Sequence, residues 1–361
     1  MPTRGNLHKE QKIHPAAEGG RGSARVVGAA QPESQPQGWS DRLGRAFLSS
    51  RLTDPRNLWF GTGRSLLALA QLSVVLFTSP HALFPPVLGE PQAPDCTTTV
   101  KSASFYCIGH LNSGFDWHRW LMAALLLVVA SGWRPRLTGI LHAWLAYSFS
   151  VSISLPDGGE SVLRIIAILI IPLCVLDDRK WHWKSGGERQ LGPIASGVGF
   201  VVLWAVRLQV AFIYLDSAVS KFGVADWVNG TAEYYIVRDP MFGVAGPTSS
   251  LMLALTDHPV GVLTLTWGAL IIEIVIAALL LLPHAGKNAA LLLDVLLHLM
   301  IISTMGLWSF SLIMIGSAVI AASPLGRLRI GGLRQVTDPK NSMESRVLHL
   351  TQEAPQPITI A

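Results

Sequence analysis

The chain has 361 residues, of which 50% are hydrophobic and only 14% are charged, and its mean hydropathy is +0.41. Soluble domains carry roughly 25% charged residues, so this composition excludes an ordinary soluble domain. The long apolar runs between basic residues also exclude a disordered or collagen-like chain. A protein that crosses a membrane several times remains.

Residues 1–57 hold nine Arg or Lys and five Asp or Glu and show no apolar period, which predicts a disordered basic tail. Crossing a bilayer takes roughly 20 mainly apolar helical residues. We therefore predict an all-α, polytopic transmembrane bundle over 58–323, followed by a tail over 324–361. Its spans, about eight in number, are 58–79, 118–133, 138–154, 161–176, 191–220, 260–283, 288–303 and 305–323.

The basic residues between these spans are sorted by side. With the N-terminus in the cytoplasm, 21 Arg and Lys residues fall inside and three fall outside. Because cytoplasmic loops carry an excess of Lys and Arg, this bias places both termini in the cytoplasm. The net charge of +5 therefore reflects the excess of Arg and Lys on the cytoplasmic side of the membrane, and we expect no nucleic-acid partner.

Two long outer stretches, about 80–117 and 221–258, are longer than simple connections need to be. The first contains Cys96 and Cys107. Because the outer side is oxidising, a disulfide that closes this loop is plausible, and two free thiols are the alternative. Cys174 lies inside an apolar helix, where a small buried thiol is expected.

Several ionisable residues fall within predicted spans. A charge near the bilayer centre is unfavourable by about 2.5 kcal/mol or more, so such residues are functional candidates. Asp294 and His298 are four apart and share one helical face, which suits either a proton relay or a structural polar pair. Residues near span ends can instead extend to the interface. The full set is Arg64, His142, Arg164, Arg207, Asp216, Lys221, Glu273, Asp294 and His298.

Motifs for metals and cofactors are weak. His142, Glu273, Asp294 and His298 are scattered over several helices without a HExxH or CxxC spacing, so we predict no metal site. No strand precedes a GxGxxG, P-loop or GxSxG element, which argues against nucleotide binding and hydrolase chemistry. The cofactor, if any, is not identified by a motif. Asp157, with two following glycines, predicts a simple turn.

The stretch from Arg207 to Tyr235 is different in kind. A helix that carries Arg207 and Asp216 ends at Lys221 and continues into an outer segment rich in Trp, Gly and Tyr. A lysine at a desolvated membrane boundary can lose its proton near neutral pH and act as a base.

This stretch resembles the HTTM domain, the membrane domain shared by bacterial proteins and the vitamin K-dependent γ-glutamyl carboxylases. In that family an aromatic-rich helix ends in a lysine and is followed by an acid-Trp pair and a glycine. The matching residues here are Lys221, Asp226-Trp227 and Gly230. The resemblance implies that the basic lysine of the carboxylases falls on Lys221.

A closer resemblance, to SdpB-type proteins of sporulation-delaying toxin systems, covers about 57–325. SdpB-type proteins act with a small SdpA-type partner to mature a secreted peptide toxin from its precursor, so the resemblance implies a similar role in a bacterial plasma membrane. It does not imply which chemistry is performed. The stretches that carry it, in order, are 63–69, 134–142, 157–159, 178–183 and 230–235.

The leading hypothesis is therefore a membrane protein that helps to mature or export a secreted antimicrobial peptide. If it is an enzyme, Lys221 is the expected base, and Asp216, Glu273 and His298 are expected to tune it or relay protons. The alternatives are a non-catalytic scaffold for a peptide-processing complex and a proton-coupled transporter. The expected binding residues are Arg207, Asp226, Trp227, Gly230, Thr231, Glu233, Tyr234 and Tyr235.

Overall fold

The fold is described from a computed structural model of the whole chain. It describes residues 54–85, 94, 96, 98–108, 116–154, 158–184, 191–240, 243–244, 248–282 and 284–324. All of these belong to one compact unit, residues 43–361. Nearly all of the predicted tails 1–57 and 324–361, and Asp157 of the predicted turn, lie outside the described residues.

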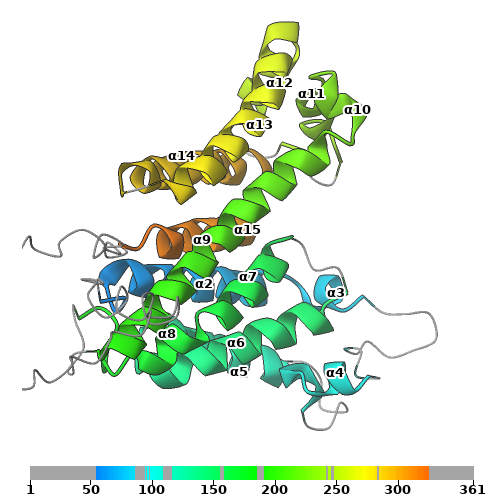
Figure 1. Cartoon of the computed structure of the whole chain (residues 1–361). Helices are drawn as coiled ribbons and strands as arrows, with labels where there is room; N and C mark the ends of the chain where they lie inside the picture. Colours follow the sequence, from blue (N-terminus) through cyan, green and yellow to red (C-terminus); the bar gives the residue numbers. More distant parts are fainter. Residues whose placement is uncertain are drawn as a thin grey trace, which may run out of the picture. The chain divides into compact units, whose positions relative to one another are not determined.

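Every regular element in the described ranges is a helix, and no β-strand occurs there, which confirms the all-α class (Figure 1). The longer helices are α2 (Leu58–Phe77), α5 (Asp116–Ala130), α6 (Pro135–Ser152), α7 (Gly158–Leu169), α9 (Pro193–Lys221), α13 (Pro259–Leu281), α14 (His284–Met305) and α15 (Trp308–Ala321). The shorter ones are α3 (Pro80–Leu83), α4 (Thr99–Ser102), the 3-10 turn η1 (Phe105–Cys107), α8 (Ile171–Leu176), α10 (Ala225–Val228), α11 (Ala232–Ile236) and α12 (Ser249–Thr256).

Four helices are long and apolar enough to cross a membrane: α2, α9, α13 and most of α14. The other four predicted spans are also helical but do not reach this standard. Helices α5 and α15 have 15 and 14 residues, so they are shorter than a typical span. The predicted span 161–176 is broken between α7 and α8, where Pro172 cannot donate a backbone hydrogen bond.

Helix α15 lies at the centre of the packing and contacts α2, α7, α9 and α14. Nearly every residue of its second half is buried. It approaches α2 closely at Gly63, which has no side chain. A Cβ added there would lie 2.4 Å from Ile320 Cγ1 and 2.7 Å from the Gly316 carbonyl oxygen. Small residues at helix crossings permit such contacts, which are the main source of attraction between helices in lipid.

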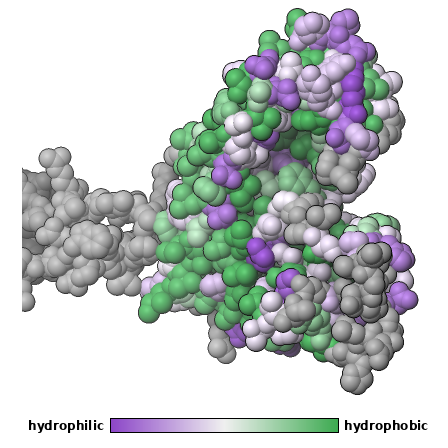
Figure 2. Space-filling view, turned by 90° about the vertical axis from the view of Figure 1, so that its right-hand side faces the viewer, coloured by the Kyte–Doolittle hydropathy of each residue, from purple (hydrophilic) through white to green (hydrophobic). Residues whose placement is uncertain are grey.

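Helices α9, α13 and α14 expose apolar side chains along much of their length. More than half of each of the side chains Phe212, Ile271 and Leu292 is exposed. Figure 2 shows hydrophobic residues over wide areas of the face drawn there. Exposed apolar faces on helices of this length are expected for surfaces that contact lipid.

A buried polar contact, centred on His182, joins the loop after α8 to α2 and to the turn between α5 and α6. The His182 N–H donates to the Gly132 carbonyl at 3.0 Å. Its ring nitrogens lie 3.3 Å from Arg64 NH1 and 3.2 Å from Ser65 Oγ. Arg64 also donates to Thr138 Oγ1 at 3.1 Å. His182 therefore connects its own loop to α2 through its ring and to the turn between α5 and α6 through its backbone.

In the loop between α3 and α5, the described residues 98–108 pack against α6. Cys96 and Cys107 form a disulfide in this loop. Ser104 Oγ lies 2.6 Å from Ser152 Oγ, and the Phe105 N–H donates to Ser148 Oγ at 2.9 Å. These bonds hold η1 against the C-terminal part of α6.

Replacing Gly132 by alanine should destabilise the His182 contact. Gly132 has a φ of +82°, and a Cβ there would lie 2.3 Å from the His182 ring. A left-handed conformation combined with an overpacked contact is expected to lower the free energy of unfolding by about 1 to 3 kcal/mol. Thermal unfolding of the purified protein in lipid nanodiscs measures this. The matched control is Gly268→Ala, where nothing lies within 4 Å of the added Cβ; equal losses in both variants would contradict the prediction.

The stability should also fall in acid because of His182, which lies outside the candidate spans. Burial lowers the pKa of His182 to about 3, and Arg64 and Arg179 add to this by repulsion. Below about pH 6.5 the imidazole of His182 binds a proton in the unfolded chain but not in the folded protein. The free energy of unfolding therefore falls by up to about 1.4 kcal/mol per pH unit. Thermal unfolding from about pH 7 to about pH 5 should show a shallower decline for His182→Gln than for the wild type. The exposed His81→Gln control should keep the wild-type slope.

Candidate functional site

Lys221, the last residue of α9, forms an ion pair with Glu273 of α13. Its Nζ lies 2.5 Å from Glu273 Oε1 and 2.7 Å from Oε2, and it donates to Ser217 Oγ at 2.9 Å. Ser217, one helical turn earlier, donates to the same Glu273 Oε1 at 3.3 Å. The two charged side chains are only 21% and 13% exposed. The sequence prediction placed Lys221 and Glu273 in one site, and the structure brings them into contact.

The pair lies deeper than the position of Lys221 on its own helix indicates. Glu273 comes 14 residues after the start of α13, which corresponds to about 21 Å along the helix axis. Lys221 therefore contacts the middle part of a candidate span rather than its end. A charge pair at such a position has little access to water, and each charge depends on the other for stabilisation.

The segment after Lys221 folds back as α10 and α11 against the first half of α13. The ammonium of Lys221 lies 5.1 Å from the centroid of the Trp227 ring, a cation–π contact. The Thr231 N–H donates to the Asp226 carbonyl at 2.8 Å and fixes the turn. Gly230 is required there, because its φ is +75° and a Cβ would lie 2.4 Å from Leu263 Cδ1.

Glu233 brings a second carboxyl group near Lys221. The Glu233 N–H donates to Thr266 Oγ1 at 3.2 Å, which anchors α11 to α13. Burial raises the pKa of the Glu233 carboxyl, and the nearby Lys221 ammonium opposes this by lowering it. The ammonium of Lys221 therefore interacts with two carboxyl groups, of which Glu273 is the one it binds directly.

Tyr234 and Tyr235 lie on α11 beside this site, with 40% and 58% of their side chains exposed. The Arg238 guanidinium lies 3.9 Å from the centroid of the Tyr234 ring. Arg238 also donates to Thr256 Oγ1 at 2.9 Å and pairs with Asp257 at 2.5 Å. These contacts hold α11 against the end of α12 and leave two aromatic rings exposed.

A second polar cluster lies about two turns before Lys221 on α9. The Tyr214 hydroxyl donates to Asp294 Oδ1 of α14. His298 Nδ1 lies 2.9 Å from the Asp294 carbonyl oxygen and 3.5 Å from its Oδ1. Asp294 and His298 are 0% and 1% exposed. The predicted contact between Asp294 and His298 is present, but His298 does not touch Lys221.

The sequence prediction missed Tyr214 and Ser217. Counted from Tyr214, Ser217 is three residues and Lys221 seven residues further on, a spacing that places all three on one face of a helix. A search for polar residues with this spacing in α9 finds them. The sequence prediction selected charged residues within apolar segments, so it passed over an uncharged tyrosine and serine.

Two predicted site residues lie elsewhere. Asp216 is exposed and points about 140° around the helix from Lys221. Arg207 is buried and lies 14 residues before Lys221, about 21 Å along α9. Its Nε donates to the Ala321 carbonyl at 2.6 Å, and its NH2 donates to the Ser323 carbonyl. Arg207 thus satisfies carbonyl groups at the end of α15 and does not belong to the Lys221 site.

The remaining intramembrane candidates form no common site. Arg64 is fully buried and does not extend to the interface. His142 is also buried, and its Nε2 has no hydrogen-bond partner. Among the residues that the structure describes, no three His, Cys, Asp or Glu side chains gather in a way that suits a metal ion.

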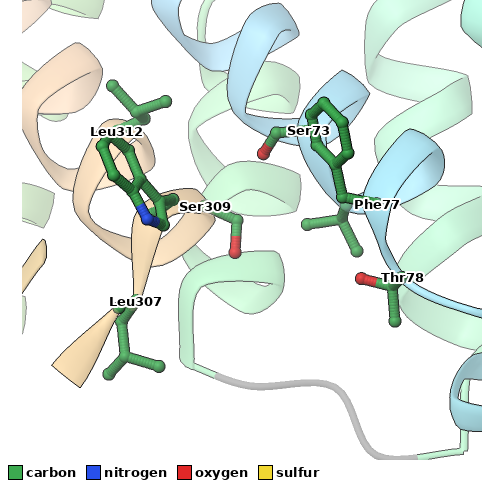
Figure 3. Close-up of a pocket in the computed structure, with 9 residues that line it drawn as sticks. Ser73, Phe77, Thr78, Leu307, Ser309 and Leu312 are labelled. Carbon is green, nitrogen blue, oxygen red and sulfur yellow. The ribbon is translucent and has the colours of Figure 1, made fainter. Parts of the chain in front are cut away.

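A separate hollow of about 460 Å³ lies between the C-terminal end of α2 and the start of α15 (Figure 3). Figure 3 shows Ser73, Phe77 and Thr78 on one side of it, facing Ser309 and Leu312 on the other. No titratable side chain lines it, so it suits apolar binding rather than acid–base chemistry. Its lining residues are Ser73, Val74, Phe77, Thr78, Gly306, Leu307, Trp308, Ser309 and Leu312.

The described residues form a helical protein with four candidate membrane spans and a lysine–carboxylate ion pair between two of them. The chain is 35% identical over 279 residues to the uncharacterized protein YitO of Bacillus subtilis, and the matched region covers 75% of this chain and 88% of YitO. It is 33% identical over 275 residues to the sporulation-delaying protein SdpB of the same bacterium, and this match covers 75% of this chain and 84% of SdpB. The chain belongs to the SdpB family.

No protein-family model matches the chain, and no solved structure matches it. The resemblance of the Lys221 segment to the HTTM domain therefore stays a prediction. The family membership rests on the two bacterial relatives alone.

Replacing Arg207 by glutamine should reduce stability without a specific effect on the Lys221 site. Two carbonyl groups lose a charged donor, and hydrogen bonds to charged groups contribute about 1.5 to 3 kcal/mol. We expect a lower membrane level and a lower unfolding temperature. Arg164→Gln is the matched control, because the Arg164 side chain is half-buried within α7 and forms no hydrogen bond or ion pair with the described residues. An unchanged unfolding temperature in Arg207→Gln would refute the structural role.

Proposed function

We propose that this protein is a multi-pass protein of the bacterial plasma membrane that helps to mature or export a secreted antimicrobial peptide. Two observations support the proposal: the membership of the SdpB family and the four helices able to span a membrane. The partners in this proposal are a precursor peptide and a small SdpA-like protein. The bundle has about eight spans, and both termini lie in the cytoplasm.

Contacts between loops support the proposed topology. Arg56, which precedes α2, pairs with Asp178 after α8 at 2.6 Å. The Arg134 N–H donates to the Lys180 carbonyl at 2.8 Å. At the opposite ends of the helices, the Ser154 N–H donates to the Leu83 carbonyl at 3.1 Å. Each contact joins segments that the charge bias assigns to the same side of the membrane.

The observation that carries the chemical part of the proposal is the Lys221–Glu273 pair. In a low-dielectric site, moving one proton from Lys221 Nζ to Glu273 Oε1 breaks an N–H bond, forms an O–H bond and removes both charges. The products are a neutral amine and a neutral carboxylic acid. The amine then has a free electron pair and acts as a base toward a precursor that reaches the outer segment 222–240.

The ion pair also favours a second function, that of a scaffold. A lysine held by a carboxylate at 2.5 Å joins α9 to α13 whether or not it reacts. In this case the protein presents the precursor to a processing enzyme or an exporter. Mutation of Lys221 then reduces the amount of protein rather than the yield of product per protein. A proton-coupled transporter is the third function, for which proteoliposome uptake is the test.

Replacing Lys221 by methionine separates these functions. Methionine keeps much of the apolar side chain and removes the ammonium, so a base role predicts a loss of about 100-fold or more in mature peptide per membrane-inserted protein, in the range typical of removed acid–base groups. Peptide mass spectrometry of the culture medium, from cells that express the protein with its neighbouring genes, measures this. Lys180→Met, at an exposed lysine near the other helix ends, is the control.

A peptide that changes by a defined mass only in Lys221→Met identifies the chemistry. Identical peptides and equal yields per protein would eliminate the base role. A loss that follows the membrane level of the protein would support the scaffold instead.

A further inference from the structure

The loop after α8 and the turn between α5 and α6 hold three exposed tryptophans together. Trp133 and Trp181 form an isolated antiparallel β-bridge, so their side chains lie on the same face of it. Trp133, Trp181 and Trp183 are 36%, 37% and 45% exposed. His182, between the last two, is fully buried against α2, because neighbouring residues of extended backbone point to opposite sides. One side of this contact is therefore bound to the helices, and the other presents aromatic rings.

The loop that carries these rings is held more firmly than a connection requires. Arg179 pairs with Asp177 at 2.6 Å and donates to the His182 carbonyl at 2.8 Å. Trp183 Nε1 donates to the Ser131 carbonyl at 2.7 Å. These bonds fix the position of the rings before any ligand arrives, and a preorganised surface loses little conformational entropy on binding.

Arg134 follows Trp133 in a strained conformation. Its φ is +37°, and among the residues that the structure describes no other residue except glycine has a positive φ. Its N–H donates to the Lys180 carbonyl at 2.8 Å, and its guanidinium lies 5.9 Å from the centroid of the Trp133 ring. Such strain persists only where the surrounding contacts enforce it, and it is found most often at functional sites. Here it places a cation beside an exposed ring.

The basic side chains around the rings have unused hydrogen-bond donors. The Arg134 guanidinium and the Lys184 ammonium form no hydrogen bond or ion pair with the described residues, and both residues are exposed. Arg136, also exposed, donates its Nε–H to the Val175 carbonyl at 2.9 Å and has no carboxylate partner in the described ranges. The surface is therefore positively charged and lacks an anion.

The acidic residues of the same loop do not supply that anion. Asp177 is buried and already binds Arg179, and Asp178 binds Arg56 at 2.6 Å. A ligand with negative charge and hydrogen-bond acceptors would complement the surface, because Arg and Lys form charge-assisted hydrogen bonds with phosphate oxygens.

The residues next to this surface indicate what kind of ligand reaches it. Leu127 near the end of α5 is 55% exposed, and Leu137 and Ile140 in the first turns of α6 are 57% and 50% exposed. Protein interfaces usually have a polar rim, whereas this surface continues into exposed apolar helix faces. Trp, Arg and Lys at the edge of an apolar helix surface are typical of the level of lipid headgroups.

We infer that these residues form a docking surface for the headgroup of an anionic phospholipid, and we call it the tryptophan platform. The cations bind the phosphate, and the aromatic rings lie at the boundary between headgroups and acyl chains. In the proposed topology this end of the helices is cytoplasmic, where anionic lipids attract basic residues. The inference goes beyond the proposed function and does not depend on it. The platform consists of Trp133, Arg134, Arg136, Trp181, Trp183 and Lys184.

Native mass spectrometry of the full-length protein tests the charge of the platform. The protein is titrated in detergent micelles with phosphatidylglycerol or with phosphatidylcholine, and the bound lipids are counted. The wild type should bind phosphatidylglycerol more tightly, and Arg134→Gln and Lys184→Gln should each weaken this binding by about 5-fold, and together by about 25-fold. Lys101→Gln in α4, at the opposite helix ends, is the control and should bind as the wild type does. Equal binding of both lipids by the wild type, or wild-type binding by the double variant, would overturn the inference.

Fluorescence quenching in nanodiscs tests the aromatic part, also where a charge variant is unstable. Phosphatidylglycerol brominated near the headgroup should quench the wild type more than brominated phosphatidylcholine does, because it is enriched at the platform. The double variant Trp133→Phe/Trp181→Phe should lose this excess. Trp267→Phe, a 38% exposed tryptophan of α13, is the control and should retain it. An excess that persists in the double variant sinks the assignment. Equal quenching by both lipids, with the platform open to acrylamide, instead indicates a protein partner.

Discussion

The structure depends on one constraint: a polar group inside a bilayer has no water to bind and must find its partner within the protein. The buried Arg207 guanidinium meets this constraint by donating to carbonyl groups at the end of α15. The buried Arg64 guanidinium of α2 meets it through the His182 ring and the Thr138 hydroxyl. Because each partner lies on another segment, satisfying a polar group also fixes how the helices are arranged.

Helix α9 carries polar side chains that need partners within the protein and that also include the ionisable groups of the candidate site. Apolar helices in lipid gain little from burying one another, so hydrogen bonds and close packing hold them together. The polar face of α9 binds α13 through Ser217 and Lys221 and binds α14 through Tyr214. The same side chains thus hold the helices together and carry the ionisable groups. Substitutions at this face have to be analysed for protein level and for product separately, because one contact serves both.

The sequence predicted a helix at the position of every long helix, because hydropathy is a local property of the chain. It also singled out the residues that form the contacts Lys221–Glu273 and Asp294–His298, because charged side chains within apolar runs are visible in the sequence. Because Arg207 and Lys221 fall on one helix, their 14-residue spacing already separates them by about 21 Å. What the sequence did not predict is the position of α15, which supplies the carbonyl partner of Arg207. Tyr214 was missed for a related reason. An uncharged hydroxyl becomes informative only when a buried carboxyl group from a helix 80 residues away lies opposite it.

The chemical state of Lys221 follows from the groups around it. The Trp227 ring and the Glu273 carboxylate both stabilise the ammonium form, and the nearby Glu233 carboxyl adds to this when it is ionised. Trp227 lies in the short segment that packs against α13 through Gly230 and Glu233, so the aromatic contact with the ammonium depends on how that segment is anchored.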